Sequence, residues 1–216
     1  MAKTLYSLML SEEVVNAVDN LSHRMGLTRS ALVNKILAEY VSLDTPESLI
    51  NNILREMESL INPSSDLVPF FAPNSRSMSL KSSLAYKYRP TVRYEVDLDP
   101  KQNNVMGTLT VALRTQSVSL LNETAEFLRI WVNAENKLLY PITNKIIEWT
   151  LFDGKFIRPI LMPDLRKSSS EIVANEISGY INLFDRCLKA YLSGEISEYG
   201  IFENYRLSLN KRKIII

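Results

Sequence analysis

The 216-residue chain is long enough for two domains or one large one, and its 46% hydrophobic and 23% charged residues are typical of a globular protein. Its net charge of +1 is not that of a protein that coats nucleic acid, and no apolar run approaches the ~18–20 residues that cross a bilayer. With one cysteine, one histidine and no apolar leader, the sequence predicts a cytoplasmic protein without disulfides, metal or cofactor.

The N-terminal stretch 3–43 predicts one short strand followed by a helix. The strand covers Leu5 to Leu10, and it has no second strand nearby in the sequence. Ser11 is a residue typical of helix N-caps, and acidic residues follow it in the first turn. The apolar residues of this helix recur in steps of four, three and four: Val14, Val18, Leu21 and Met25.

A second short helix is predicted after a glycine turn. Gly26 supplies the left-handed residue that ends the first helix, and Thr28 or Ser30 can cap the second. The apolar face of the second helix consists of Leu32 or Val33, Ile36, Leu37 and Tyr40.

This order of elements resembles the ribbon-helix-helix family of DNA-binding proteins, the CopG/Arc/MetJ group. The matching pieces are the strand that runs into Leu10-Ser11-Glu12, the turn from Met25 to Ser30, and the helix Leu32–Tyr40. They cover about 43 residues, or roughly a fifth of the chain. The resemblance implies an intertwined homodimer whose two-stranded ribbon enters the major groove of double-stranded DNA.

The resemblance also implies two sets of DNA contacts. Alternate ribbon residues face the groove, and these are Leu5, Ser7 and Met9, with Lys3 at the edge. The other ribbon residues, Tyr6, Leu8 and Leu10, face the dimer core. The start of the second helix holds a phosphate through Thr28, Arg29 and Ser30. The groove-facing set is more apolar than in the family, where at least two of these residues are usually polar or basic.

A physical argument supports a dimer. One strand cannot form a sheet, and two helices of this length cannot enclose a core. A second copy would pair the strands across a two-fold axis and bury the apolar faces of four helices. Two alternatives stay open: the helix pair packs on the rest of the chain, or the outer ribbon face packs on the second domain.

The connector between the domains is placed at residues 46–77, after an N-terminal domain of residues 1–45. Thr45 and Pro46 are typical of a helix start, and the helix is predicted to reach Ile61. Residues 62–77 contain three prolines and four serines and predict a linker.

Residues 78–216 predict an α+β domain with an antiparallel sheet and two helices. Asp153-Gly154 indicates a hairpin turn, and alternating residues indicate a second hairpin earlier in the chain. The predicted strands are Tyr86–Leu98, Val105–Thr115, Ile146–Phe152 and Lys155–Leu161. One helix should begin at Ser119 or Asn122 and fade by Pro141, and the longest should cover Ser170–Leu192. The tail Phe202–Ile216 is predicted to be a strand or hairpin.

Five basic residues without an acid lie between Arg76 and Arg93, interleaved with Tyr86 and Tyr88. Such a pattern can track a nucleic-acid backbone. A basic strand face beside an apolar core face is the commoner explanation, because the tyrosines and the basic residues alternate along the strand.

The sequence predicts a DNA-binding protein rather than an enzyme, since no catalytic constellation or phosphate-binding loop is evident. A transcriptional repressor that occupies its operator as a dimer is the first hypothesis, with a small-molecule or protein effector at the second domain. An antitoxin or plasmid-maintenance protein is the second hypothesis, and a dimerisation protein without DNA binding is the third.

Overall fold

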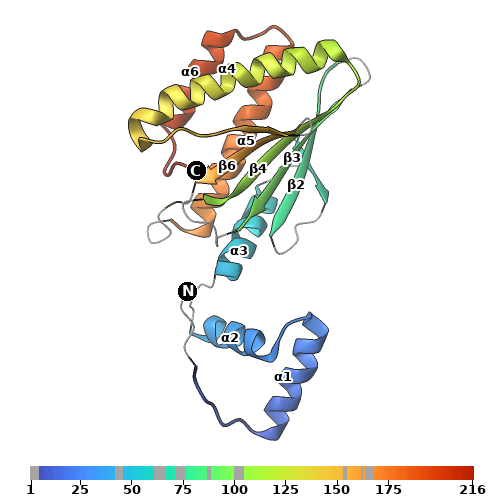
Figure 1. Cartoon of the computed structure of the whole chain (residues 1–216), viewed down its shortest axis with the longest axis vertical. Coiled ribbons are helices and arrows are strands. Elements are labelled where there is room, and N and C mark those ends of the chain that lie inside the picture. The colour runs from blue at the N-terminus through green and yellow to red at the C-terminus, as the bar shows by residue number, and fades with distance from the viewer. Residues whose placement is uncertain are drawn as a thin grey trace. The chain divides into compact units, whose positions relative to one another are not determined.

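The computed structural model describes residues 5–41, 46–60, 67–71, 76–86, 89–99, 105–152, 155–161, 163 and 168–216. The chain divides into two compact units, Met1–Ser48 and Leu49–Ile216, and each is considered by itself (Figure 1). The described elements are α1 (Glu12–Met25), α2 (Arg29–Tyr40), α3 (Pro46–Ser59), β1 (Leu67–Phe71), β2 (Ser77–Ser83), β3 (Thr91–Leu98), β4 (Val105–Arg114), α4 (Val118–Thr143), β5 (Thr150–Phe152), β6 (Lys155–Leu161), α5 (Ser170–Leu192) and α6 (Glu198–Leu209). The predicted α+β class is therefore confirmed.

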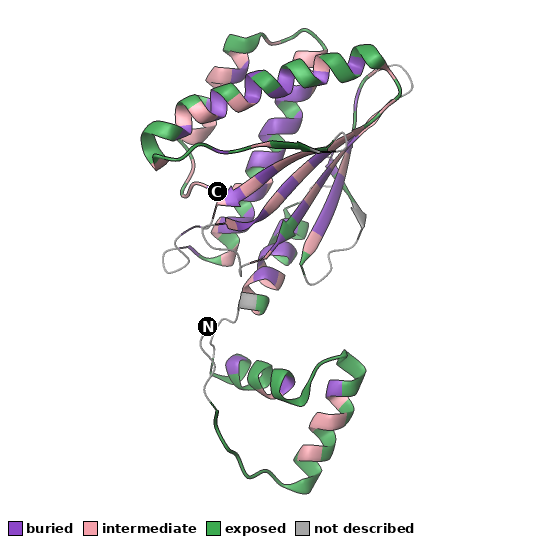
Figure 2. Cartoon of the chain, in the orientation of Figure 1, coloured by how far each residue is buried: buried purple, intermediate pink, exposed green. Residues whose placement is uncertain are grey.

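The second unit is built on a six-stranded antiparallel sheet with the order β1-β2-β3-β4-β6-β5. Its central strands alternate between buried and half-exposed residues, as a sheet with one covered face requires (Figure 2). On β3 the buried set is Val92, Tyr94, Val96 and Leu98, which are every second residue of the strand.

Helices α3, α4, α5 and α6 contribute to the core that covers this sheet face. Helix α4 contacts both α5 and α6 (Figure 1). Aromatic rings join these helices. The ring centroid of Trp131 lies 4.9 Å from that of Phe184 and 5.3 Å from that of Tyr205, and both pairs are edge to face. Edge-to-face pairs of this kind add about 0.5–1.5 kcal/mol each beyond the apolar area that they bury.

A buried ion pair ties the helices to the β5–β6 hairpin. Glu135 of α4 and Arg158 of β6 are both fully buried, with Arg158 Nη2 2.9 Å from Glu135 Oε1. The hydroxyl of Tyr205 donates to the same oxygen at 2.9 Å, and Trp149 Nε1 donates to Oε2 at 2.7 Å. Arg158 also donates to the carbonyl oxygen of Ile216 at 2.7 Å. Burial by itself lowers the pKa of Arg158, but the carboxylate of Glu135 together with Tyr180 and Tyr205 outweighs it, so the net shift is upward and the guanidinium stays charged.

The region predicted as a connector contributes to the second unit. Helix α3 buries Ile50, Ile53 and Met57 in its core, and Leu67 of β1 is also buried there. Strand β1 contains Pro69, which an edge strand accepts because one side of its backbone needs no partner. The apolar segment Leu67–Phe71, which lies within the predicted linker, is thus the first strand of the sheet.

The C-terminal half holds three described helices, and the prediction of two was wrong. The tail contains α6 instead of a strand, and Ile201 and Tyr205 are buried one helical turn apart. Helix α4 continues through Pro141 and ends at Thr143, and the capping residue Asn144 has a left-handed φ of 51°. At 26 residues α4 is longer than α5, which has the predicted bounds Ser170–Leu192.

The predicted N-terminal strand is absent from the described strands of the single chain. Residues 5–10 form no regular element, and the sheet begins at Leu67. The physical reason is that a lone strand has no neighbour for its backbone amides and carbonyls in this unit. The ribbon-helix-helix arrangement therefore stays a proposal about two copies.

None of the helices in the described part of the chain combines the length and apolar composition needed to cross a bilayer.

Candidate nucleic-acid interface

Helices α1 and α2 are joined by the predicted glycine turn. Gly26 has a φ of 63°, a value that glycine adopts without the steric cost of a side chain. Its amide donates to the carbonyl of His23 at 3.3 Å, and the next amide, of Leu27, donates to Ser22 at 2.9 Å. These bonds satisfy the last carbonyls of α1, so the turn direction is set locally.

Thr28 caps the start of α2, as one of the two predicted alternatives. Its Oγ1 accepts a hydrogen bond from the amide of Ala31 at 3.2 Å. The amides of Arg29 and Ser30 belong to the first turn, where an α-helix has no carbonyl to pair with them. Such amides, together with the helix dipole, are suited to hold a phosphate.

Arg29 forms an ion pair that the sequence analysis missed. Its Nε and Nη2 atoms contact the two carboxylate oxygens of Asp19 on α1. The pair links the two helices across the turn, and the carboxylate offsets the positive charge available to a phosphate. No local pattern indicated this contact, because the two residues are ten positions apart and on different helices.

The ribbon residues differ in their exposure. Leu5 and Met9 are fully exposed, at 96% and 101%, whereas Leu8 and Leu10 are half-exposed at 52% and 47%. Ser7 is also exposed. All residues from Leu5 to Leu10 are thus exposed in the single chain, and Tyr6, predicted to face the dimer core, is 81% exposed. Lys3 lies outside the described residues.

The apolar faces of α1 and α2 are largely uncovered in the single chain (Figure 2). Leu32 is buried, but most of the other predicted core residues are not. The exposed apolar residues on or beside the two helices are Val14, Met25, Leu27, Ile36, Leu37, Tyr40 and Val41. So many exposed large apolar side chains on one pair of helices are typical of a surface that a partner covers.

Nearby acidic side chains partly neutralise the basic stretch between Arg76 and Arg93. Arg76 pairs with Asp99 at 3.1 Å, and Arg93 pairs with Glu95 at 2.9 Å. The predicted tyrosine interleaving falls partly on residues 87–88, which lie outside the described residues. The described part of this stretch favours a solvated strand face over a nucleic-acid track.

No protein-family model matches the chain, and neither the comparison with curated proteins nor that with solved structures finds a match. Within the described ranges, no group of three His, Cys, Asp or Glu side chains is placed to hold a metal ion.

Proposed function

We propose that the protein is a dimeric, sequence-specific double-stranded DNA-binding protein that acts as a transcriptional repressor. The observation that carries this proposal is the uncovered apolar surface of the α1–α2 pair, beside an extended segment with unpaired backbone. Exposed apolar surface of this kind is typical of a region that an interaction partner covers. A second copy supplies both a complementary helix pair and a strand for the extended segment.

The dimer would place its DNA contacts on one surface. The two segments Leu5–Leu10 would pair antiparallel, with Leu8 and Leu10 facing the helices. Ser7 would then face base edges, and Leu5 and Met9 would contact thymine methyl groups. The first turn of each α2 would hold a backbone phosphate, which sets the register of the protein on DNA.

Few basic residues are available to attract DNA to the first unit. Residues 5–41 contain three basic residues against four acidic ones in each copy. Affinity should therefore rest on the helix-start amides, Arg29 and close ribbon contacts, with a shallow dependence on salt. A gel-shift assay with the DNA upstream of the protein's own gene tests the proposal. A dimer that binds no DNA at low salt would instead favour the dimerisation protein, an alternative that the exposed apolar side chains of Leu5 and Met9 support.

Ser7→Ala tests the ribbon. If Ser7 contacts a base edge, the variant should lose about 1–3 kcal/mol of discrimination at one base position and keep its affinity for other sequences. Binding measured on a library of single-base operator variants would show this change. An equal loss on every sequence would show that Ser7 does not contact a base.

Arg29→Ala tests the helix start. We expect weaker binding to all sequences and a salt slope reduced by about one per copy, or about two for the dimer, because one phosphate contact per copy is removed. Asp19→Asn is the matched variant, since it frees Arg29 from its ion pair and should strengthen binding. Affinity measured against salt concentration for both variants separates the outcomes: opposite effects support the phosphate contact, and equal losses contradict it.

A further inference from the structure

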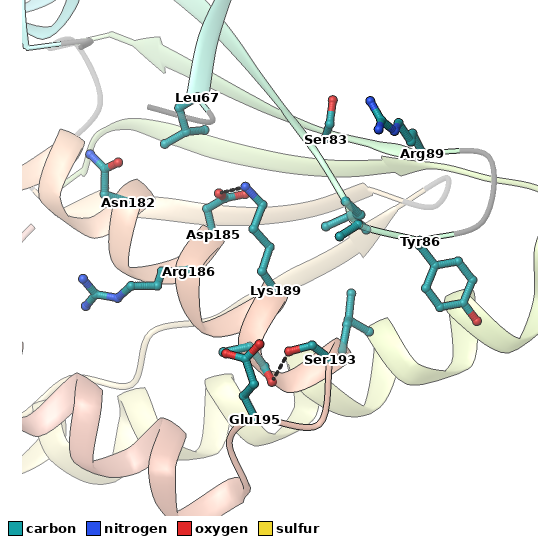
Figure 3. A pocket seen from close by; sticks show the side chains of 14 residues that line it. Leu67, Ser83, Tyr86, Arg89, Asn182, Asp185, Arg186, Lys189, Ser193 and Glu195 are labelled. Atoms are coloured by element: carbon teal, nitrogen blue, oxygen red, sulfur yellow. Dashed lines mark hydrogen bonds and ion pairs between the residues drawn. The ribbon is translucent and has the colours of Figure 1, made fainter. Parts of the chain in front are cut away.

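A pocket of about 860 Å³ lies in the second unit, between α5 and the connection from β2 to β3 (Figure 3). This volume is within the range of small-molecule sites. Residues from both elements line it, and Figure 3 shows Asp185 and Lys189 of α5 between Arg89 on one side and Arg186 on the other. The proposed DNA binding through α1 and α2 does not use this pocket.

The floor of the pocket is a fixed polar cluster. Asp185 is 4% exposed, and its carboxylate accepts hydrogen bonds from Tyr94 at 2.9 Å and Ser82 at 3.0 Å. The ammonium of Lys189 lies 2.8 Å from the same carboxylate. Burial, and then the charge of Asp185, raises the pKa of Tyr94, so its hydroxyl remains a donor. With three donors in place, Asp185 is neutralised and adds little negative charge to the pocket.

The rim of the pocket carries an excess of positive charge. Arg89 and Arg186 are exposed, and neither has a carboxylate partner among the described residues. Glu195 is the acid on the rim. Because the charges of Asp185 and Lys189 offset each other, the pocket is left with two guanidinium groups and one carboxylate. Guanidinium groups bind carboxylates and phosphates through two parallel hydrogen bonds.

Apolar side chains form part of the remaining wall. Leu67 and Leu84 are buried and Tyr86 is half-buried, and all three line the pocket. A mixed lining of this kind binds the apolar or planar body of a ligand and fixes its orientation through a few polar groups. The lining therefore suits a molecule that combines an acid group with an apolar or planar body.

The backbone at Arg89 gives a second, independent observation. Its φ is 44°, and Pro90 follows it, although a residue before proline favours an extended conformation. Its amide donates to the carbonyl of Tyr86 at 2.9 Å, which holds the turn. Asn144 is the other described non-glycine residue with a positive φ, and it ends a helix, where asparagine is common. Arginine at a position that suits glycine indicates that its side chain has a use at the pocket rim.

We propose that this pocket binds a small organic anion of up to nucleotide size. Its carboxylate or phosphate pairs with Arg89, its apolar or planar body contacts Leu84 and Tyr86, and Arg186 adds positive charge on the opposite side of the rim. The inference is independent of DNA binding, because it concerns a site within the second unit alone. In a DNA-binding protein this site would be the place for an effector.

Calorimetric titration of the full chain with two charge-matched probe pairs tests the proposal. The pairs are naphthoate with naphthalenemethanol, and adenosine monophosphate with adenosine. Each anion that fits should bind at least about tenfold more tightly than its neutral partner. Binding of naphthoate alone identifies a carboxylate ligand, and binding of the nucleotide alone identifies a phosphate ester; either result supports the site. Equal affinity for the charged and neutral members of both pairs, or no binding of either anion, overturns it.

Arg89→Gly separates a binding role from a structural one. The variant removes the side chain and relieves the left-handed backbone, so anion affinity should fall about tenfold while the unfolding temperature stays equal or rises. Asn144→Gly is the matched control, since it makes the same backbone change outside the pocket and should leave anion affinity unchanged. Arg186→Ala, at an exposed helix position on the opposite side of the rim, should weaken binding by a smaller factor. Unchanged affinity in both arginine variants would refute the assignment.

Discussion

Replacing Leu8 with aspartate should convert the proposed dimer into monomers. In the proposed ribbon Leu8 faces the four-helix core, and the dimer would have to bury two unpaired carboxylates near its two-fold axis. An uncompensated charge of this kind costs more than about 3 kcal/mol, which raises the dissociation constant at least about 100-fold. Sedimentation equilibrium over a range of concentrations measures the change, and DNA binding should be lost with the dimer.

Met9→Asp is the control for the Leu8 variant. The two residues are neighbours, but Met9 is fully exposed and Leu8 half-exposed, so the same charge on Met9 should leave the dimer intact. If the Met9 variant dissociates while the Leu8 variant stays dimeric, the true ribbon register differs by one residue from the proposed one. A dimer that survives both substitutions would contradict the ribbon altogether and indicate that the helix faces associate in another way.

Replacing Glu135 with glutamine should destabilise the second unit by about 3–5 kcal/mol, because it leaves the buried guanidinium of Arg158 without its counter-charge. That loss is a large fraction of the ~5–15 kcal/mol that stabilises a typical domain. Urea unfolding followed by tryptophan fluorescence measures it, since both tryptophans, Trp131 and Trp149, belong to this unit.

A surface variant and a double variant show whether the loss of stability in the Glu135 variant comes from the buried ion pair. Glu126→Gln removes a carboxylate from an exposed ion pair with Arg129 on the same helix, and solvent screening predicts little measurable change. Glu135→Gln combined with Arg158→Met removes both buried charges, so the double variant should lose less stability than the sum of the two single variants. An additive double variant would show that packing, and not the ion pair, accounts for the loss.

Sequence patterns predicted the elements that depend on near neighbours. The bounds of α5 agree with the prediction because Ser169 caps the helix and its apolar residues follow a helical period. The turn at Gly26 and the cap at Thr28 were predicted for the same reason, since their hydrogen bonds join residues at most five positions apart. The hairpin of β5 and β6 was predicted from the Asp-Gly signal between two apolar runs.

Contacts between distant residues determined the rest. The sequence placed α3 and the apolar patch at Leu67 in a connector, whereas burial against the sheet makes them part of its unit. It predicted the α6 segment as a strand or hairpin, because a short apolar pattern suits either element until a neighbouring surface selects one. The Arg29–Asp19 pair was missed for a similar reason, since it needs two helices to be folded against each other.

The sequence by itself determined an α+β chain with an N-terminal pair of amphipathic helices, because caps, turns and hydrophobic periods act within a few residues. The tertiary structure alone decided the strand order, the buried Glu135–Arg158 pair and the cationic pocket at α5. The Asp185 cluster shows the reason, because its hydrogen bonds to Tyr94 and Ser82 join residues 91 and 103 positions apart. Side chains so distant acquire a shared environment, and hence a shared chemistry, through folding.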